Sequence, residues 1–522
     1  MVARHRGRLG VGMWVIASLV IALALSACDS NSDSSSSSSS KASSGSPATG
    51  TGSRDRVRDR NTQTIGGVTL PTSTGKPNVR EVEQIAQAAY IYGYPVVLAT
   101  LTGEVNTQVR NASQQTSPPI APTNQLAKYE NQATPALTSV PAPPTNVLLT
   151  QVWMDLSKEP QVLHVPAIKD RYYLVQILDY WTNSQSISSR TNGSDAGDYA
   201  FVGPDWKGKL PAGVKRVSVP TNQNWTFTSV QFNGPSDLDA VRKIQAGFTI
   251  QPLSSYGKDY TPPKNVPVTS NVSTKTTPAK QVKAFSAETY LNKLGPDMGP
   301  NPPPARDDPV IKQLARIGVV PGKSFDWSSL GDAEQEAAKR GVKKAHQAIT
   351  KESLNLLGKK VINSWSLQNN LGTYGTKYLF RAAVDSQGLG AELPQDQMYA
   401  LTFKDGSGHV LSGKRNDYTM HFDKGQFPPT NAIWSLSLYN SKLGLVKNPI
   451  DRYVIAPNWN DIKYNSDGSL DIYIQHKAPT SSKKKANWLP APDGPFVLLL
   501  QDYWPKQQMI SLNYTIPPVE KN

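Results

Sequence analysis

The stretch Gln161–Trp181 constrains the fold more than any other part of the 522-residue chain. Its pattern predicts two strands, Gln161–Pro166 and Arg171–Trp181, joined by a short polar turn into a hairpin. Successive side chains point to opposite faces of a strand, and both faces of the second strand are mostly apolar. We therefore expect this strand to be covered on both sides. Gln176 and Asp179 are its polar exceptions, and buried polar groups need hydrogen-bond partners.

Length and composition leave room for two or three domains with sizeable cores. The chain is 38% hydrophobic and contains 11 Trp and 21 Tyr. Cys28 is its only cysteine, so neither a disulfide within the chain nor a cysteine metal cluster stabilises the fold. The formal net charge of +15 would suit anionic partners, but the basic residues are scattered along the chain. We interpret this charge as a solvated surface and expect no nucleic-acid partner.

The N-terminus has the arrangement of a secretory signal. Three arginines among the first eight residues precede an apolar stretch, Leu9–Leu23, which is short for a membrane span of about 20 residues. Leu25-Ser26-Ala27-Cys28 follows and resembles the lipobox of bacterial lipoproteins. We predict that residues 1–27 are a lipoprotein signal peptide and that the thiol of Cys28 carries diacylglycerol. The alternatives are a plain signal peptide with an incidental cysteine and an uncleaved anchor helix.

A tether is expected between the lipid and the first domain, so that residues 28–75 comprise the lipidated Cys28 and a Ser-rich segment. Ser34–Ser40 is a run of seven serines, and the surrounding sequence has almost no apolar side chains. Such a segment cannot bury a core, and we predict that it is disordered. Lipid chains on Cys28 would hold the protein at the cell membrane, facing the periplasm or the exterior.

A first folded domain is expected over residues 76–256. Asn78 and Glu81 have the spacing of a capping box and begin a helix, which Gly93-Tyr94-Pro95 should end or kink. A polar, Pro-containing loop over residues 106–145 follows. The rest of the domain alternates short apolar runs with turns, which is typical of strands.

Residues 257–305 contain many polar and proline residues, and we interpret them as an extended linker with a short helix near Thr289–Leu294. The second domain is expected over residues 306–522. Small residues recur every fourth position from Ala333 to Ala345, a helical stripe that allows close packing against another element. From Tyr399 onward, many short strands with Gly and Pro turns indicate a sandwich or jelly-roll.

Two parts of the chain resemble uncharacterised bacterial families. The first family is known as domain of unknown function 1254, and its resemblance lies in AYIYGYP at Ala89–Pro95, VWMDLSKEPQVLHVP at Val152–Pro166, RYYLVQILDYWTN at Arg171–Asn183 and GPDWKG at Gly203–Gly208. The second is domain of unknown function 1214, with YLFRAAVDSQGLGAELPQDQMYA at Tyr378–Ala400, FPPTNAIWSLSLYN at Phe427–Asn440 and NWLPAPDGPFVLLL at Asn487–Leu500. The resemblance implies β-rich, sandwich-like domains in this order, without assigned chemistry.

The fold class that we predict is α+β and mostly β. It consists of two β-sandwich or jelly-roll-like domains with peripheral helices, preceded by the disordered tether. The chain departs from the first family at Pro144–Thr150, where an acid and a tyrosine that the family usually shows are missing. If that stretch shapes a site in relatives, the site is altered here.

The residues that carry chemistry form no compact motif. The histidines lack the spacing of metal ligands, and there is neither a nucleophile elbow nor a phosphate or dinucleotide loop. We therefore expect no metal and no cofactor. Tryptophans such as Trp181, Trp225 and Trp434 stand beside Asn, Asp and Gln, as in some ligand-binding sandwiches, but most such side chains are core.

Acidic residues near arginines provide weak catalytic candidates, namely Asp179, Arg190 and Asp423. A general acid or base needs a perturbed pKa in a cleft, and structural ion pairs are the simpler interpretation. The pairs that we consider are Asp179 with Arg171 or Arg190, and Asp423 with Arg381 or Arg452.

These observations favour a bacterial cell-envelope lipoprotein that binds a small or polymeric ligand at the junction of two β-rich domains. Two alternatives stay open: an envelope hydrolase that uses the acidic residues, and a structural lipoprotein that binds a protein partner or forms a homo-oligomer. Membrane lipid, reached through Cys28, is the partner that the sequence indicates most directly.

We predict that Cys28→Ser releases the protein from the membrane, because serine offers no thiol for the lipid. Cell fractionation and immunoblotting would show the variant in the soluble fraction. Ser30→Ala, a change of similar size in the tether, should leave the protein in the membrane fraction. A Cys28→Ser variant that stays wholly in the membrane fraction would refute the lipid anchor.

Overall fold

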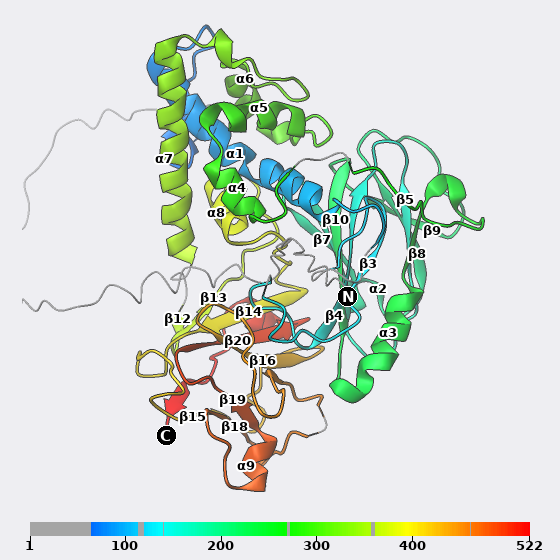
Figure 1. Ribbon diagram of the computed structural model, residues 1–522, viewed down its shortest axis with the longest axis vertical. Helices are drawn as coiled ribbons and strands as arrows, with labels where there is room; N and C mark the ends of the chain where they lie inside the picture. Colours follow the sequence, from blue (N-terminus) through cyan, green and yellow to red (C-terminus); the bar gives the residue numbers. More distant parts are fainter. Residues whose placement is uncertain (1–63, 113–118, 139, 269–271, 357–360, 460) are drawn as a thin grey trace, which may run out of the picture.

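The computed structural model describes residues 64–112, 119–138, 140–268, 272–356, 361–459 and 461–522. Helices gather at one end of the molecule, one group of sheets lies beside them, and a second group lies below (Figure 1). Cys28, the signal segment and the predicted tether up to residue 63 lie outside the described residues. The lipid anchor and the disorder of residues 28–63 therefore stay predictions. For residues 64–75 the predicted disorder is wrong, because β1 (Thr64–Ile65) pairs with β2 (Val68–Thr69), and Ile65 and Leu70 are buried in the core.

The first group of strands forms a β-sandwich. One sheet has the order β3-β4-β10-β6-β7 and the other β11-β5-β8-β9. Both contribute side chains to one core, among them Val152, Leu163 and Phe201. The elements of this half are β3 (Ala127–Lys128), β4 (Val147–Asp155), β5 (Gln161–Val165), β6 (Tyr173–Asp179), β7 (Ser184–Ser188), α2 (Ser189–Asn192), β8 (Gly197–Val202), β9 (Val214–Ser218), β10 (Gln223–Gln231), η1 (Pro235–Asp237), α3 (Leu238–Gly247), β11 (Thr249–Pro252) and η2 (Leu253–Ser255).

The predicted hairpin of β5 and β6 is wrong, although both strands exist. β5 pairs with β8 and β11, whereas β6 pairs with β7 and β10. Each strand is interior to its own sheet, and the turn between them carries the chain from one sheet to the other. Every residue of β6 is buried, so the expected cover on both sides is confirmed. An apolar pattern predicts such burial but does not select the neighbouring strand.

The second group of strands forms another sandwich, with the sheet orders β12-β13-β14-β20-β16-β17 and β19-β18-β15-β21. Met420, Leu436 and Ile472 are among the side chains of its shared core. Its elements are β12 (Val361–Ile362), β13 (Trp365–Leu367), β14 (Gln397–Thr402), β15 (Tyr418–Phe422), β16 (Trp434–Asn440), β17 (Val454–Ile455), β18 (Leu470–Gln475), α9 (Ser482–Ala486), β19 (Trp488–Pro490), β20 (Phe496–Tyr503), α10 (Gln507–Ile510) and β21 (Val519–Lys521). The predicted fold class, α+β with mostly β-rich domains, is confirmed.

A helical layer packs against both sandwiches. Side chains of α1 and α7 share a core with Trp153 and Phe227 on the outer face of the first sandwich. Phe380 and Val384 of α8 pack with Leu401 and Leu499 on the outer face of the second. The layer comprises α1 (Val79–Asn106), α4 (Pro278–Ala284), α5 (Ala287–Asp297), η3 (Ala305–Asp307), α6 (Asp308–Ala315), η4 (Trp327–Ser329), α7 (Asp332–Leu356) and α8 (Tyr378–Gln387), with β1 (Thr64–Ile65) and β2 (Val68–Thr69) at its edge. Within the described residues, no helix combines the length and hydrophobicity of a membrane span.

Helix α1 begins as predicted but continues past the predicted break. The Asn78 side chain accepts a hydrogen bond from the Glu81 N–H at 3.0 Å, and the Glu81 carboxylate accepts one from the Asn78 N–H at 3.1 Å. Pro95 lies inside the helix and cannot donate a backbone hydrogen bond. Its neighbours are buried, and at Gly93 an added Cβ would lie 2.3 Å from the Leu294 side chain of α5. This burial outweighs the local preference for a helix end.

Residues 257–305 differ from the extended linker that their composition suggested. They contain α4 and α5, and α5 includes the short helix expected near Thr289–Leu294. Val282 of α4 and Tyr290 of α5 are fully buried in the helical core. Pro278 is the first residue of α4 and Pro296 lies inside α5, so these prolines do not keep the segment extended.

The small-residue stripe of α7 packs directly against α1, as predicted, and the two helices lie side by side in Figure 1. A Cβ added at Gly341 would lie 2.4 Å from the Glu83 carbonyl oxygen and 3.2 Å from the Ala86 Cβ. Only a residue without a side chain permits this approach of two backbones.

We predict that Gly341→Ala destabilises the protein, although the same change inside an exposed helix stabilises by about 1 kcal/mol. The added methyl group must displace the α1 backbone, which we expect to lower the free energy of unfolding by ~2 kcal/mol. Denaturant unfolding would measure this loss. Gly75→Ala is the control, because its Cβ would meet nothing within 4 Å. Equal stability of Gly341→Ala and wild type would contradict the packing.

Candidate functional site

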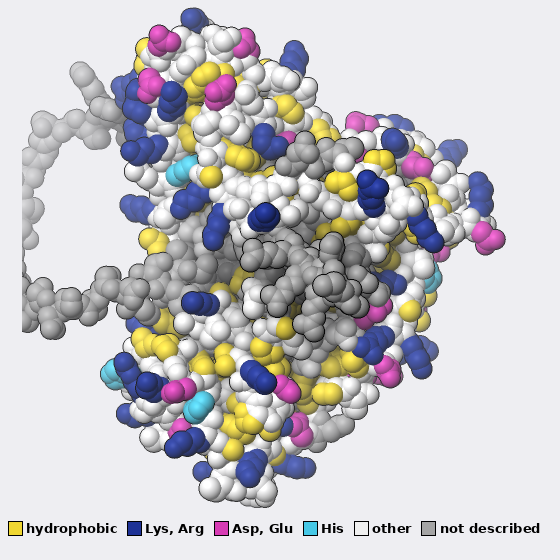
Figure 2. Space-filling model, viewed as in Figure 1, with side chains coloured by type: hydrophobic (Ala, Val, Ile, Leu, Met, Phe, Trp, Pro, Cys, Tyr) yellow, Lys and Arg dark blue, Asp and Glu magenta, His cyan; other side chains and the backbone are white. Residues whose placement is uncertain are grey.

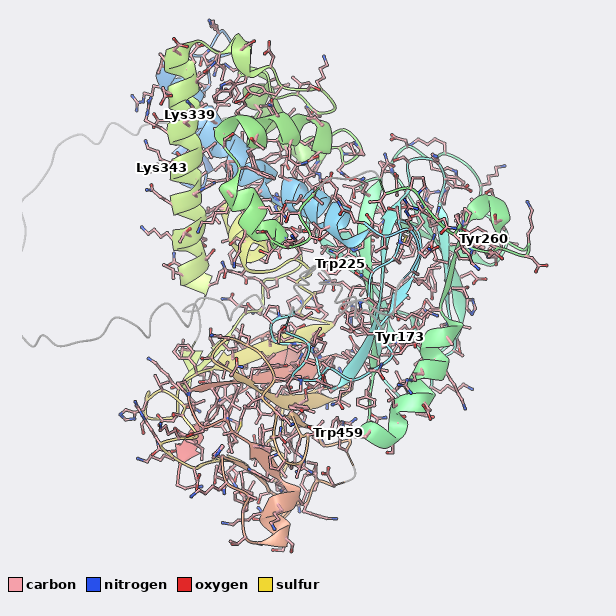
Figure 3. All side chains as sticks on the ribbon, in the orientation of Figure 1. Tyr173, Trp225, Tyr260, Lys339, Lys343 and Trp459 are labelled. Carbon is pink, nitrogen blue, oxygen red and sulfur yellow. The ribbon has the colours of Figure 1, made fainter. Side chains whose placement is uncertain are left out.

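A cavity of about 230 Å³ lies where the helical layer meets both sandwiches. Its walls come from α1, from β4 and β10, from the start of α4, from the end of α8 and from two loops. In Figure 3, Trp225 lies where the helices approach the first sandwich. The lining residues are Leu98, Thr102, Asn106, Pro141, Trp153, Trp225, Thr277, Pro278, Ala279, Lys280, Asp385, Ser386, Gln387, Gly388, Leu389 and Leu443. We call this space the junction cavity.

Two tryptophans form a flat wall of the junction cavity. Trp153 of β4 and Trp225 of β10 are direct partners across the antiparallel ladder. Their rings stack with centroids 5.0 Å apart and planes 5° from parallel. The Trp225 indole N–H donates to the Gln151 side-chain oxygen at 3.0 Å. The pair therefore offers a rigid aromatic surface to anything that enters.

Two buried lining residues keep polar atoms without partners in the described part of the chain. They are Nε1 of Trp153 and Oδ1 of Asn106. The Asn106 amide nitrogen donates to the Thr102 carbonyl oxygen at 2.8 Å, so only the side-chain oxygen of Asn106 has no hydrogen-bond partner in the described chain. Buried polar groups in proteins are nearly always hydrogen-bonded, so these two atoms are exceptions. They have almost no accessible surface and therefore lie within the wall of the cavity and do not face its interior.

Asp385 connects the junction cavity to a buried cluster around Arg381. One carboxyl oxygen of Asp385 accepts a hydrogen bond from the Thr182 hydroxyl at 3.0 Å. Burial raises the pKa of Asp385 well above its ordinary value, and the Arg381 guanidinium opposes this shift. Arg381 is fully buried, and its Nη1 donates to the Trp181 carbonyl oxygen at 3.1 Å.

Aromatic and carboxyl groups from several elements complete this cluster. The Arg381 guanidinium lies over the rings of Tyr378 and Trp181, 5.5 and 5.8 Å from their centroids. Tyr378 and Tyr92 both donate to the Asp307 carboxylate, at 2.5 and 3.2 Å. The cluster therefore joins α1, α8, η3 and the end of β6. We call it the Arg381 cluster; its members are Tyr92, Asp179, Trp181, Thr182, Asp307, Tyr378, Arg381 and Asp385.

Asp179, the first predicted candidate, belongs to the Arg381 cluster and is buried. Its carboxylate accepts hydrogen bonds from the Asn183 backbone and side chain, both at 2.9 Å. Burial raises its pKa, while the bonds from Asn183 and the charge of Arg381 oppose the shift. Its predicted pairing with Arg171 or Arg190 is wrong, because Arg171 pairs with Asp237 instead, at 2.7 Å.

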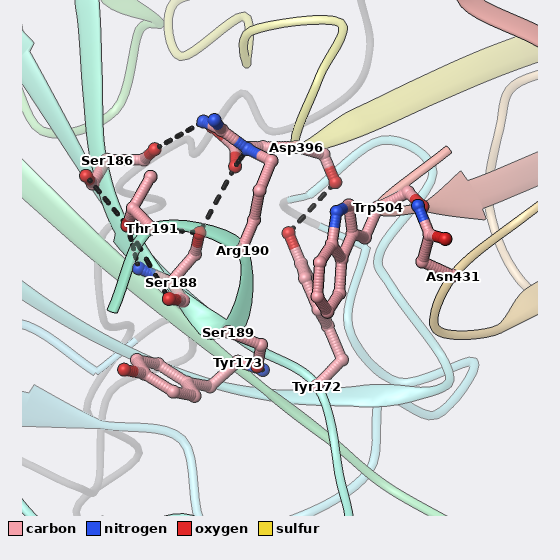
Figure 4. Close-up of polar contacts among 10 residues, drawn as sticks. All are labelled: Tyr172, Tyr173, Ser186, Ser188, Ser189, Arg190, Thr191, Asp396, Asn431 and Trp504. Atoms are coloured by element: carbon pink, nitrogen blue, oxygen red, sulfur yellow. Dashed lines mark hydrogen bonds and ion pairs between the residues drawn. The ribbon is translucent and has the colours of Figure 1, made fainter. Parts of the chain in front are cut away.

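Arg190, the second candidate, pairs with Asp396 across the junction between the two sandwiches (Figure 4). Nε of Arg190 donates to one carboxylate oxygen at 2.8 Å and Nη2 to the other at 3.1 Å. Tyr172 donates to the Asp396 carbonyl oxygen at 2.9 Å. This bidentate pair on a buried carboxylate fixes the orientation of the two sandwiches.

Asp423, the third candidate, is exposed at the end of β15. It lies 3.3 Å from Nε2 of His421, whose Nδ1 lies 2.6 Å from Asp471. The hydrogen bond to Asp471 raises the pKa of His421 above its ordinary value. The predicted pairing of Asp423 with Arg381 or Arg452 is wrong, since Arg381 is buried in its cluster and Arg452 pairs with Asp461.

The structure does not bring Asp179, Arg190 and Asp423 together, and none of them lines the junction cavity. Among the described residues, no group of three or more His, Cys, Asp or Glu side chains is arranged to hold a metal ion. Lys and Arg side chains are scattered over the face shown in Figure 2, with Asp and Glu among them.

The junction cavity depends on residues that sequence reasoning did not single out, above all Asn106, Trp153 and Asp385. Trp225 was considered only as one of many aromatic residues. One sequence feature could have indicated Trp153 and Asp385 as functional candidates. Both residues lie inside segments that resemble known families.

Comparisons with known proteins agree with this two-part architecture. The family model described as "Protein of unknown function (DUF1254)" matches residues 123–252, and the one described as "Protein of unknown function (DUF1214)" matches residues 396–507. The chain matches both family models, in the order that the sequence predicted. The resemblance predicted from the sequence is thus confirmed, and the junction cavity lies where the two domains meet the helical layer.

Solved structures extend this comparison to the fold. The crystal structure of the VPA0106 protein from Vibrio parahaemolyticus is 23% identical, with a TM-score of 0.64 over 84% of this chain and 100% of that chain. That protein shares the fold of this chain. An uncharacterized protein from Burkholderia cenocepacia is 9% identical, covers 85% of this chain and 93% of its own, and has a TM-score of 0.38, which is too low to support an argument. No curated protein matches the chain.

Three buried acids have pKa values raised by burial toward or above neutrality. The pKa is raised to about 7 for Asp297 and Glu392 and to about 8 for Asp502. Asp502 on β20 is fully buried, and the side chain of Thr430 opposes the shift only in part. Its protonated form is therefore the one that the fold tolerates.

This pKa predicts how stability depends on pH. The carboxyl of Asp502 has a pKa near 3.9 when unfolded and about 8 when folded, so its contribution is present below about pH 4 and is lost as pH rises through 8. An asparagine side chain at this position cannot ionise, so Asp502→Asn should gain stability relative to wild type between pH 5 and pH 9. We expect the difference in Tm to grow by ~3 °C or more across this range.

Thermal unfolding at pH 5, 7 and 9 measures this difference. Asp493→Asn is the matched control, because Asp493 is exposed and its loss should shift Tm by a similar amount at each pH. Parallel pH profiles for wild type and Asp502→Asn would contradict the raised pKa.

Proposed function

We propose that this protein is a cell-envelope lipoprotein that binds one small, largely apolar molecule in the junction cavity. The observation that carries the proposal is the cavity itself, which has an aromatic wall and draws residues from the helical layer and from both domains. Ligand sites in proteins occur preferentially at such domain junctions and are lined mainly by apolar and aromatic side chains.

The size of the junction cavity supports a ligand larger than water. A single water needs about 10–15 Å³ of such space, and a dry apolar cavity of about 150 Å³ holds a molecule of the size of benzene. The cavity here is about 230 Å³. An unfilled apolar space lowers stability roughly in proportion to its volume, so a ligand that fills it restores lost contacts.

The walls of the cavity are held in place before any ligand arrives. Besides the pair of Arg190 and Asp396, Asn146 of the first sandwich donates to Ser435 at 2.9 Å and accepts from Tyr503 at 2.8 Å. All of these side chains but Arg190 are buried. A preformed site spends little binding free energy on ordering its own groups.

The N-terminal sequence supports a ligand from the envelope. A flexible tether over residues 28–63, the part of the predicted tether that precedes the described residues, would have a root-mean-square span of about 30–36 Å. Lipid on Cys28 would therefore keep the cavity close to the membrane surface. No contact among the described residues assembles Asp179, Arg190 and Asp423 into a hydrolytic site, so the structure gives this alternative no specific support.

Binding of Nile red, an apolar fluorescent dye, tests the proposal on the folded protein. We expect saturable binding of one dye molecule per chain, with the blue-shifted emission of an apolar site. Ala279→Trp places a large ring among the lining residues and should weaken binding at least tenfold, because it occupies the space that the dye needs.

Ala284→Trp is the matched control, since Ala284 lies on the same helix, is exposed and does not line the cavity. It should bind the dye as wild type does, and both variants should keep the Tm of wild type. Absence of saturable binding, or equal binding by the two variants, would refute the proposed site.

A further inference from the structure

The exposed sides of α4 and α7 indicate how the protein lies on the membrane. We infer that these two helices dock on the anionic phospholipid headgroups of the membrane to which Cys28 is proposed to attach the chain. This inference rests on the lipid anchor of the proposed function and goes beyond it, because a flexible tether leaves the orientation of the folded part free. A few lysines orient an anchored protein but do not hold an unlipidated one at a membrane.

Cationic residues prevail on the exposed sides of α4 and α7. Helix α4 contains two lysines, the stretch Lys339–Lys351 of α7 contains five Lys or Arg residues, and neither contains Asp or Glu. Among the described residues, no acid forms an ion pair with Lys280, Lys283 or Lys343. Figure 2 shows Lys and Arg side chains over both helices, whereas Asp and Glu lie mainly nearer the end of the helical layer. Such a surface attracts an anionic one.

The acids nearby neutralise only part of this charge. Glu83 of α1 pairs with Arg340 and Lys344, which lie on the side of α7 toward α1, at 2.9 and 2.5 Å. Glu336 pairs with Lys339 at 2.7 Å, but the two side chains are 62% and 54% exposed. Water and salt screen a pair as exposed as this one, so Lys339 can exchange its partner for a headgroup.

A groove of about 350 Å³ joins the two helices. Lys339 and Lys343 lie one turn apart on α7 (Figure 3) and line this groove together with the half-buried rings of Phe285 and Trp327. Aromatic rings beside lysines are typical of surfaces that lie at the boundary between headgroups and acyl chains. The acid among the lining residues is Glu288, and the two lysines outnumber it.

The lysines of α4 belong to the same surface. Burial lowers the pKa of His346, which also lines the groove, and the charge of Lys283 adds to this shift, so Lys283 lies close to the groove. Lys280 lies three residues earlier on the same helix and therefore on the same side. We call this surface the basic face; its members are Lys280, Lys283, Phe285, Trp327, Lys339 and Lys343.

The basic face borders the junction cavity. Lys280 is the exposed residue among those that line the cavity, so the cavity reaches the surface beside α4. The described chain also begins at this layer, because Ile65 of β1 is buried in the helical core. Docking of the basic face would therefore place the opening of the cavity against the bilayer, where apolar molecules are concentrated.

The test uses the lipidated protein, reconstituted into vesicles of phosphatidylcholine alone and of an equal mixture of phosphatidylcholine and phosphatidylglycerol. Acetic anhydride crosses bilayers and acetylates exposed lysines, and peptide mass spectrometry measures the rate at each lysine. We expect at least threefold slower acetylation of Lys283, Lys339 and Lys343 in the anionic vesicles, because each lysine favours contact with such a surface about fivefold. High salt should remove this difference.

Lys477 and Lys483 are the internal controls, since both are exposed on the second sandwich, and α9 lies at the far end of the molecule from the helical layer (Figure 1). They should react at the same rate in both kinds of vesicle. The double variant Lys283→Gln/Lys343→Gln should lose most of the protection at Lys339. The matched double variant Lys477→Gln/Lys483→Gln should keep it, and all four side chains are exposed, so both variants should keep the Tm of wild type.

The possible outcomes separate the two proposals. If Cys28 carries no lipid by mass spectrometry and the protein does not stay with the vesicles, the lipid anchor of the proposed function fails. If the protein is anchored but the basic face reacts equally in both vesicles, as expected for a surface that binds an acidic protein, this inference is overturned. Protection of Lys477 and Lys483 instead would also overturn it. Charge-dependent protection confined to the basic face supports it.

Discussion

The buried charge of Arg381 is the interaction on which the arrangement of the helical layer and the first sandwich depends. A guanidinium with no exposed surface is stable only if its surroundings compensate its lost hydration. Here Trp181 supplies a carbonyl oxygen and a ring face, and the guanidinium opposes the rise in pKa that burial causes at Asp179 and Asp385. These groups come from the end of β6 and from α8, so removing the charge would loosen the contact that forms one side of the junction cavity.

Hydrogen bonds and an ion pair join the two domains, although each domain matches a separate family model. Arg190 binds Asp396, and Asn146 binds Ser435 and Tyr503, all across the junction. Asn146 lies just before β4 of the first sandwich and, through these bonds, holds that sandwich against the second. The site that we propose at the junction requires the two domains to keep this relative orientation.

Local patterns predicted the elements well, because the capping box of Asn78, the apolar faces of β6 and the small residues around Gly341 each act through neighbours in the sequence. Long-range choices were not predictable in the same way. Nothing in the pattern of β5 tells which strand it pairs with, and the continuation of α1 past Pro95 depends on burial by α5. The junction cavity was the hardest feature to predict from the sequence. Its lining residues lie far apart in the chain, from Leu98 to Leu443, and only the fold brings them together.

Native mass spectrometry of the lipidated protein, released gently from its own membranes, tests the central claim most directly. The account predicts a second species that is heavier by one small molecule per chain, present in wild type and in Ala284→Trp and absent from Ala279→Trp. The mass of the added molecule would then identify it. A spectrum with only the bare lipoprotein, or with the same added mass in Ala279→Trp, would contradict a ligand in the junction cavity.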